Sequence, residues 1–334
     1  MKKKYVSRLI NISCFLFVSI GLFLLFRNGD WSKIVFIKDN VNYAGIIAVI
    51  FLGGICQFLV IFRWYLLLIP IKNDIRLGSI CRIAIGAILL NHVAPGKVGY
   101  PAKAYFLKKS EDIPISSSVP SLFAELMLDY SITLVLFLFA VVTGGYAKDV
   151  IRLISGYLDF RYLWAIPIFV IIIILIVIPF KRRIQSSNIS KNLVAAIGQT
   201  KKRLDILLWV VLITLIYLVI WFISDYILVK SLGYNIPLIF LIFAGAFTNI
   251  VVILAPLPGG LGVREISSAY LFKVFFNLGE VALVMILLSR LFTFITLFIL
   301  YFGDWIMRLV TSNKNVMQRV TKPELTGDIS KEAI

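Results

Sequence analysis

The chain has 334 residues, of which 60% are hydrophobic and only 15% are charged. Because ordinary soluble domains are about 45–50% apolar, this composition indicates an integral membrane protein. Lys and Arg outnumber Asp and Glu by 34 to 17, an excess that in a membrane protein faces anionic lipid surfaces and argues against nucleic acid as a partner.

The N-terminal segment combines Lys2, Lys3 and Lys4 with an apolar run at residues 9–26. This run is about as long as a membrane-spanning helix requires, and no small-x-small cleavage site follows it. We therefore expect an uncleaved first span in the cell membrane, with the N-terminus in the cytoplasm.

Five further apolar runs of bilayer length follow, at residues 43–62, 120–142, 162–180, 206–229 and 281–302. Two other apolar segments, residues 79–107 and 236–276, are interrupted by HVAPGKVG and LAPLPGGLG. Proline removes a backbone donor and glycine permits positive φ, so we expect a helix to end at each interruption. The sequence thus predicts an all-α polytopic membrane protein with about six full spans and two broken segments, which either re-enter the membrane or cross it.

Basic residues favour the re-entrant arrangement. If the first broken segment enters from the cytoplasm and returns, Lys103, Lys108, Lys109 and the basic residues of 181–203 all lie in the cytoplasm. If the second does the same from outside, the polar tail 311–334 is cytoplasmic too. A single transmembrane domain over residues 1–310 then consists of inverted repeats at about 1–145 and 160–310. Ordinary loops between complete spans remain the alternative.

Broken segments at matching positions of two repeats point to a substrate site within the membrane. Backbone without helical partners must be buried in protein or line a water-filled cavity. The helix that resumes after Gly262 directs its N-terminal amides toward the break, beside Arg264, so we expect an anion site there. The candidate head-group contacts are Lys97, Lys103 and Arg264, with Gly96, Gly99, Gly259, Gly260 and Gly262 for close backbone approach and Pro95, Pro256 and Pro258 as helix breakers.

Ionisable side chains inside apolar spans form a second group of candidates, because each costs at least about 2.5 kcal/mol near the bilayer centre. Glu125 and Asp129 are four residues apart and share one helical face. Arg290 lies at a similar depth in the last span. We predict an ion pair between Arg290 and one of these carboxylates at the repeat interface, either as a structural pair or, with Glu265, as a gate or proton-coupling site.

Two residues near the predicted span ends, Asp225 and Trp64, are expected to be anchors at the membrane surface. The lone His92 and the three cysteines show no metal-ligand spacing, and no nucleotide-binding loop is present. We therefore expect neither a metal nor a cofactor.

Two motifs resemble a known family. LAPLPGGLGVREISSAYLF, followed by Arg290 in the next span, resembles the second signature of the lysylphosphatidylglycerol synthase transmembrane, or flippase-like, family (UPF0104-type membrane proteins). LLNHVAPGKVGYPAKAYFLKK, with AELMLD after it, resembles the first signature. Tyr100 stands where the family commonly has Glu, Lys103 holds the basic position, and Leu126 replaces an Arg.

The resemblance implies a lipid flippase domain, of the kind that forms the membrane half of enzymes that aminoacylate phosphatidylglycerol and move the product outward. Those enzymes add a large soluble synthetase domain, for which residues 311–334 leave no room, so we expect no transferase activity. Together with the broken helices, the resemblance favours translocation or binding of an anionic phospholipid or a polyprenyl-phosphate-linked lipid.

Two other functions remain open. One is a non-catalytic membrane subunit that docks a cell-envelope glycosyltransferase or lipid-modifying enzyme through residues 181–203. The other is an integral membrane enzyme in which Glu125 and Asp129 perform acid and base chemistry.

Overall fold

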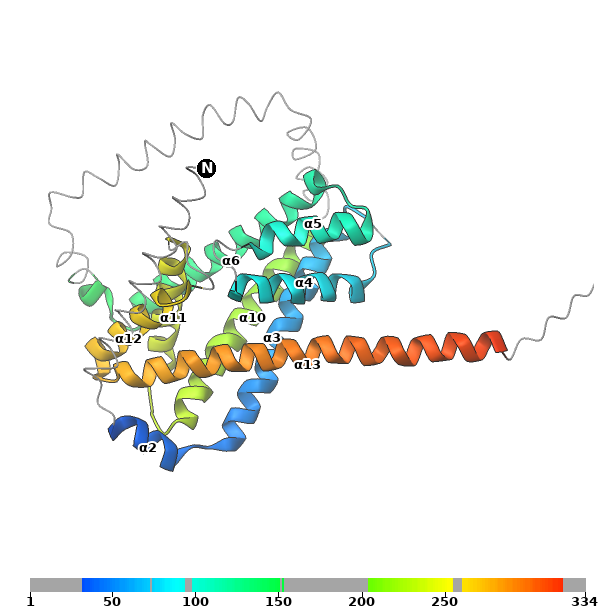
Figure 1. The fold of residues 1–334 in the computed structure, drawn as a ribbon. Helices are drawn as coiled ribbons and strands as arrows, with labels where there is room; N and C mark the ends of the chain where they lie inside the picture. Colours follow the sequence, from blue (N-terminus) through cyan, green and yellow to red (C-terminus); the bar gives the residue numbers. More distant parts are fainter. Residues whose placement is uncertain are drawn as a thin grey trace, which may run out of the picture.

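The computed structural model describes residues 32–72, 74–93, 98–150, 152, 204–254 and 260–320. Within these ranges every regular element is a helix (Figure 1). The spans expected at 9–26 and 162–180, together with the basic residues of 181–203, lie outside the described residues.

Four helices in the described ranges have the length and apolar composition to cross a membrane. They are α3 (Tyr43–Leu68), α6 (Ile115–Thr143), α10 (Leu204–Ser231) and α13 (Gly279–Val320). Each contains one of the predicted apolar runs, and the 26 residues of α3 give a rod about 39 Å long. The short helix α2 (Ser32–Asn40) precedes α3, and α13 continues well beyond the helical body (Figure 1).

Both interrupted segments form pairs of shorter helices, as the sequence predicts. The first consists of α4 (Leu77–Val93) and α5 (Gly99–Glu111), and the second of α11 (Leu238–Leu254) and α12 (Val263–Phe276). Gly260 and Gly262 adopt φ values of 66° and 78°, which L side chains rarely adopt, and α12 begins immediately after them. The limbs have 13 to 17 residues, fewer than the roughly 20 that a full crossing requires.

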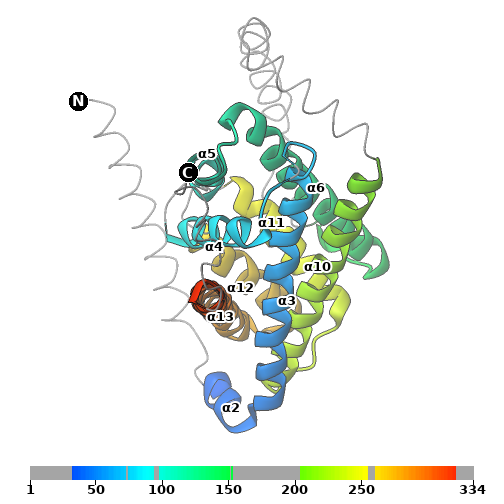
Figure 2. The ribbon, with the colours of Figure 1, turned by 90° about the vertical axis from the view of Figure 1, so that its right-hand side faces the viewer.

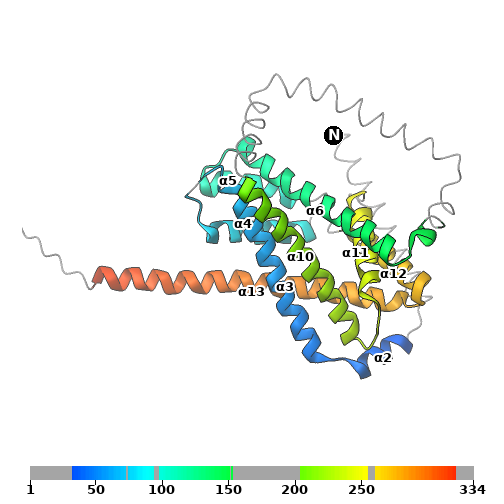
Figure 3. The ribbon, with the colours of Figure 1, turned by 180° about the vertical axis from the view of Figure 1, so that it is seen from behind.

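The two halves repeat the same order of a long helix, a broken pair and a long helix, and their packing repeats as well. The long helices α3 and α10 pack against each other along the centre of the molecule (Figures 2 and 3). The contact between α6 and α11 corresponds to the contact between α13 and α4. In the same way, the contact between α5 and α6 in the first half corresponds to that between α12 and α13 in the second. Exchanging the halves therefore maps each of these contacts onto its counterpart. The opposite orientation of the halves across a membrane stays a prediction.

Apolar side chains fill the interior and also cover much of the outside. In the second half, Phe240, Phe243 and Phe272 are fully buried and form an aromatic cluster with Tyr146. On the outer surface, large apolar side chains such as Phe51, on α3, are strongly exposed. Exposed apolar surface of this extent is typical of contact with lipid.

Candidate functional site

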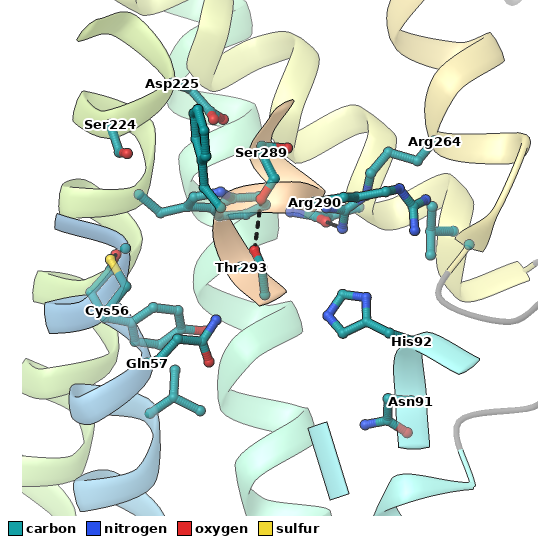
Figure 4. A pocket seen from close by; sticks show the side chains of 18 of the residues that line it. Cys56, Gln57, Asn91, His92, Ser224, Asp225, Arg264, Ser289, Arg290 and Thr293 are labelled. Atoms are coloured by element: carbon teal, nitrogen blue, oxygen red, sulfur yellow. Dashed lines mark hydrogen bonds between the residues drawn. The ribbon is translucent and has the colours of Figure 1, made fainter. Parts of the chain in front are cut away.

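A cavity of about 360 Å³ lies where the two broken segments meet the long helices (Figure 4). Asn91 and His92 line it from the end of α4, and Asn249 and Arg264 line it from α11 and α12. The remaining wall comes from α3, α5, α6, α10 and α13. Segments far apart in the sequence therefore contribute to one site.

Arg264 projects from the first turn of α12 toward this cavity. One of its terminal nitrogens donates to Asn249 Oδ1 at 2.9 Å, and its guanidinium lies 5.7 Å from the centre of the Trp221 ring. Its buried Nε has no hydrogen-bond acceptor among the described residues. Arg264 is thus held by two neighbours at the cavity wall, and its role as a head-group contact stays a prediction.

Glu265 ties the start of α12 to the last long helix. Its carboxylate is buried and lies 2.8 Å from Nε of Arg290, on α13. The other carboxylate oxygen accepts the backbone N–H of Gly262 at 2.7 Å, which satisfies one of the free amides at the helix N-terminus. This arrangement holds Arg290 in the cavity wall.

The predicted pairing of Arg290 with Glu125 or Asp129 is wrong, because both carboxylates pair with cations nearer to them. Arg63, fully buried on α3, donates to both oxygens of Asp129 and lies 3.3 Å from Glu125. Tyr217 donates a further hydrogen bond to Asp129. Sequence reasoning missed Arg63 because the predicted span ended at residue 62, although an arginine within an apolar run is itself a signal.

Lys103 has a different environment from the one predicted. Its Nζ lies 2.9 and 3.0 Å from the two oxygens of Glu125 and 4.6 Å from the centre of the Trp64 ring. It is buried in this cluster and does not line the cavity. The same contact corrects Trp64, which is completely buried beneath Lys103 and not at a membrane surface.

Asp225 is also placed differently from the prediction. It is 8% exposed and lines the cavity beside Ser224, because the face of α10 that carries it is turned toward the cavity and not toward the membrane surface. Figure 4 shows Asp225 and Ser224 on one side of the cavity and His92 and Arg264 on the other.

The glycines predicted for close approach are described in part. Gly99 packs α5 tightly on α4, since a Cβ there would lie 2.1 Å from the carbonyl oxygen of Ala87, and its N–H donates to Asn91 Oδ1 at 2.8 Å. Gly260 lines the cavity, and Gly262 is the residue before α12. The other predicted residues at the two breaks lie outside the described residues: Pro95, Gly96, Lys97, Pro256, Pro258 and Gly259.

The part of the chain that the structure describes holds no group of three His, Cys, Asp or Glu side chains that is placed to bind a metal ion. The charged side chains that line the cavity are Arg264, Arg290 and Asp225, and they offer a ligand hydrogen bonds and charge.

Comparison with known proteins agrees with the sequence motifs. The lysylphosphatidylglycerol synthase TM region family matches residues 11–300. A UPF0104 membrane protein of Methanocaldococcus jannaschii is 26% identical over 234 residues, which cover 68% of this chain and 96% of that protein. No solved structure matches the chain significantly. Because the family match covers most of the sequence, including both broken segments and all four long apolar helices up to residue 300, the chain belongs to the lysylphosphatidylglycerol synthase transmembrane-region family.

Proposed function

We propose that this protein binds an anionic phospholipid or a polyprenyl-phosphate-linked lipid and moves it between the leaflets of the membrane. The observation that supports this most is the shared cavity, which both broken segments line and to which Arg264 and Arg290 contribute. Its volume of about 360 Å³ lies within the range of small-ligand sites, roughly 300–1,000 Å³. That volume suits a lipid head group, while the acyl chains remain along the apolar outer surface.

The phosphate is recognised by donors that the protein holds in place before the lipid arrives. Arg264 lines the cavity and lies in the first turn of α12, where the helix dipole also favours an anion. Arg290 is aligned by its ion pair with Glu265. A charge-assisted bond from an arginine is roughly twice as strong as one between neutral groups, so Arg264 is expected to supply most of the affinity.

Movement of the lipid requires the cavity to open toward each side of the membrane in turn. In each half a buried ion pair joins the second limb of the broken segment to the long helix that follows it, Lys103 to Glu125 and Glu265 to Arg290. We assign the opening to separation of these limbs from their long helices, which places Glu125, Asp129, Glu265 and Arg290 in a gating role.

Reconstitution into liposomes tests the transport function. Fluorescent phosphatidylglycerol is placed in both leaflets, and dithionite quenching of the outer leaflet reports exchange. We expect exchange well above protein-free liposomes, and a loss of about tenfold or more in Arg264→Gln. The matched control is Arg82→Gln, which removes an arginine that pairs with Asp304 at 3.5 Å outside the cavity. No exchange for any of several anionic lipids would reject transport, and equal rates in the two variants would reject the role of Arg264.

The proposal assigns no group transfer to this chain. Purified protein supplied with lysyl-tRNA and phosphatidylglycerol is expected to form no lysyl-lipid, as measured by thin-layer chromatography with radiolabelled lysine. Formation of the aminoacyl-lipid by the chain alone would instead make it an enzyme.

A further inference from the structure

Asp225 is the buried acidic side chain that the proposed function leaves without a role. It lines the cavity from α10, and among the described residues no hydrogen bond or ion pair holds it. By contrast, Glu125, Asp129 and Glu265 each contact at least one basic side chain. A buried carboxylate without a partner is costly in its charged form.

Comparison of the two halves shows that their buried charges are paired differently. Arg63 on α3 and Asp225 on α10 lie at similar distances from the starts of corresponding helices, with opposite charges. In the first half Arg63 contacts both Glu125 and Asp129. In the second half the corresponding contact between Asp225 and Arg290 is not made, and both residues line the cavity instead. The three charged residues of the first half are thus joined through Arg63, whereas in the second half the carboxylate of Asp225 faces the cavity.

The charged side chains at the described cavity sum to zero when Glu265, the partner of Arg290, is counted with them. Arg290 is matched by Glu265 at 2.8 Å, so Arg264 and Asp225 contribute one positive and one negative charge to the described lining. A head-group phosphate that binds Arg264 adds a second negative charge near Asp225. In an environment of low dielectric, two carboxylate- or phosphate-type charges opposite one arginine repel each other strongly.

We propose that binding of an anionic head group in this cavity is coupled to the uptake of one proton by Asp225. The proposal rests on the proposed function and adds how that site keeps its charge balanced. The proton removes the negative charge of the carboxylate when the phosphate supplies its own. A lipid that moves through the site therefore binds together with one proton, and the proton gradient across the membrane acts on its movement.

Other titratable groups face the same cavity. The lining includes Cys56 on α3, His92 on α4, Tyr100 on α5, Tyr130 on α6 and Tyr217 on α10 itself. The two arginines come from α12 and α13, and the described part of α11 contributes only amide and apolar groups. Of these, His92 is the competing proton acceptor. His92 lies on the same side of the cavity as Arg264 (Figure 4). Protonation of His92 would add a second positive charge near this arginine and is therefore unfavourable, whereas protonation of Asp225 makes it neutral.

Isothermal titration calorimetry with dihexanoyl-phosphatidylglycerol, on protein in detergent, measures the coupling directly. Titrations at about pH 7.5 in two buffers of different ionisation enthalpy give the number of protons taken up per lipid bound. We expect up to one proton for the wild type, and affinity that rises as pH falls, by at most about tenfold per pH unit, because the bound state holds the extra proton.

Three variants separate Asp225 from its surroundings. Asp225→Asn resembles the protonated acid, so we expect no proton uptake and, at high pH, the affinity that the wild type reaches only at low pH. Asp205→Asn removes an exposed carboxylate from the first turn of the same helix and is expected to behave as wild type. His92→Gln is expected to keep the proton uptake.

Several results would overturn the coupling. They are equal heats of the wild type in the two buffers, proton uptake that survives Asp225→Asn, and uptake that is abolished by His92→Gln. Tighter, pH-independent binding of dihexanoyl-phosphatidylethanolamine would also overturn it, because the head-group ammonium would then balance the charge. If Asp225→Asn fails to fold, equal heats of the wild type in the two buffers still overturn the coupling, and the His92→Gln variant still tests the competing proton acceptor. Failure of the wild type to bind any anionic lipid would instead reject the proposed function.

Discussion

Lys103 and Glu265 occupy comparable places near the start of the second limb of each broken segment, yet their charges are opposite. Each is neutralised by a residue of the following long helix, Glu125 on α6 and Arg290 on α13. Each half therefore contains an ion pair between the second limb and the long helix, and the polarity of this pair differs between the halves. This explains how Lys103 stands at a predicted head-group position and still serves the packing of its own half.

Arg63 is predicted to be the residue whose loss destabilises the described core most. Arg63→Met leaves Asp129 without its cation inside the protein, at an expected cost of about 3–5 kcal/mol. Arg82→Met, which removes a partly exposed ion pair with Asp304, is expected to cost less than about 1 kcal/mol. The free energies of unfolding of both variants are compared in detergent, with intrinsic fluorescence as the probe of unfolding.

A second variant tests the cause of that loss. Arg63→Met combined with Asp129→Asn removes both charges and keeps the contact between Lys103 and Glu125, so we expect it to recover most of the lost stability. If the double variant is less stable than Arg63→Met alone, the loss comes from packing of the arginine side chain and not from the uncompensated carboxylate.

Glu265 is predicted to contribute through two separable interactions. Glu265→Gln loses the ion pair with Arg290 but keeps an oxygen that accepts the Gly262 N–H, whereas Glu265→Ala loses both. We expect the Ala variant to be less stable than the Gln variant by about 1 kcal/mol, the usual value of a helix cap. Equal stability of the two variants in thermal unfolding would show that the cap contributes nothing.

At the scale of the elements, short limbs distinguish the broken segments from the long helices. Gly99 allows α5 to start in direct contact with α4, and Asn91 accepts its N–H from the end of that helix. In the second broken segment the positive φ values of Gly260 and Gly262 allow α12 to begin in the cavity wall. Small residues thus allow the helix ends to lie within the apolar interior. Their backbone N–H groups then donate hydrogen bonds to nearby side chains, Gly99 to Asn91 and Gly262 to Glu265.

Gly99→Ala is predicted to force α5 away from α4. A Cβ at this position would lie 2.1 Å from the Ala87 oxygen and 2.5 Å from the Asn91 side chain, and overpacking of this kind costs about 1–3 kcal/mol. Gly86→Ala, in the middle of α4, meets nothing within 4 Å and is expected to be neutral or slightly stabilising. Thermal unfolding in detergent compares them, and similar melting temperatures would contradict the close approach.

At the scale of the whole molecule, the packing is that of two equivalent halves around the central pair α3 and α10 (Figure 2). Each half supplies one broken segment to the same cavity. If the two halves have opposite orientations in the membrane, as the sequence predicts, such a relation would let them exchange conformations and give access to one site from either side.

The orientation of the halves is open to a direct test. Lys109 and Lys273 are exposed and lie near the ends of the corresponding limbs α5 and α12. In a background without the native cysteines, Lys109→Cys is predicted to react with a membrane-impermeant thiol reagent from the cytoplasm, and Lys273→Cys only from outside. Labelling of both from the same side would show that the repeats are parallel.

Local chemistry was sufficient to predict the helical membrane class, the four long apolar helices that the structure describes, and the ends of the helices at both breaks. These features depend on apolar run length and on the backbone limits of proline and glycine, which act within a few residues. The partners of the buried charges were decided only by tertiary structure. Arg63, Lys103, Glu125 and Asp129 come from three helices, and Asp225 lies in the cavity because of how α10 packs. Residue spacing along one helix specifies a face, but the neighbour of that face depends on how the helices pack, and an unpaired carboxylate becomes visible only when every nearby cation has been placed.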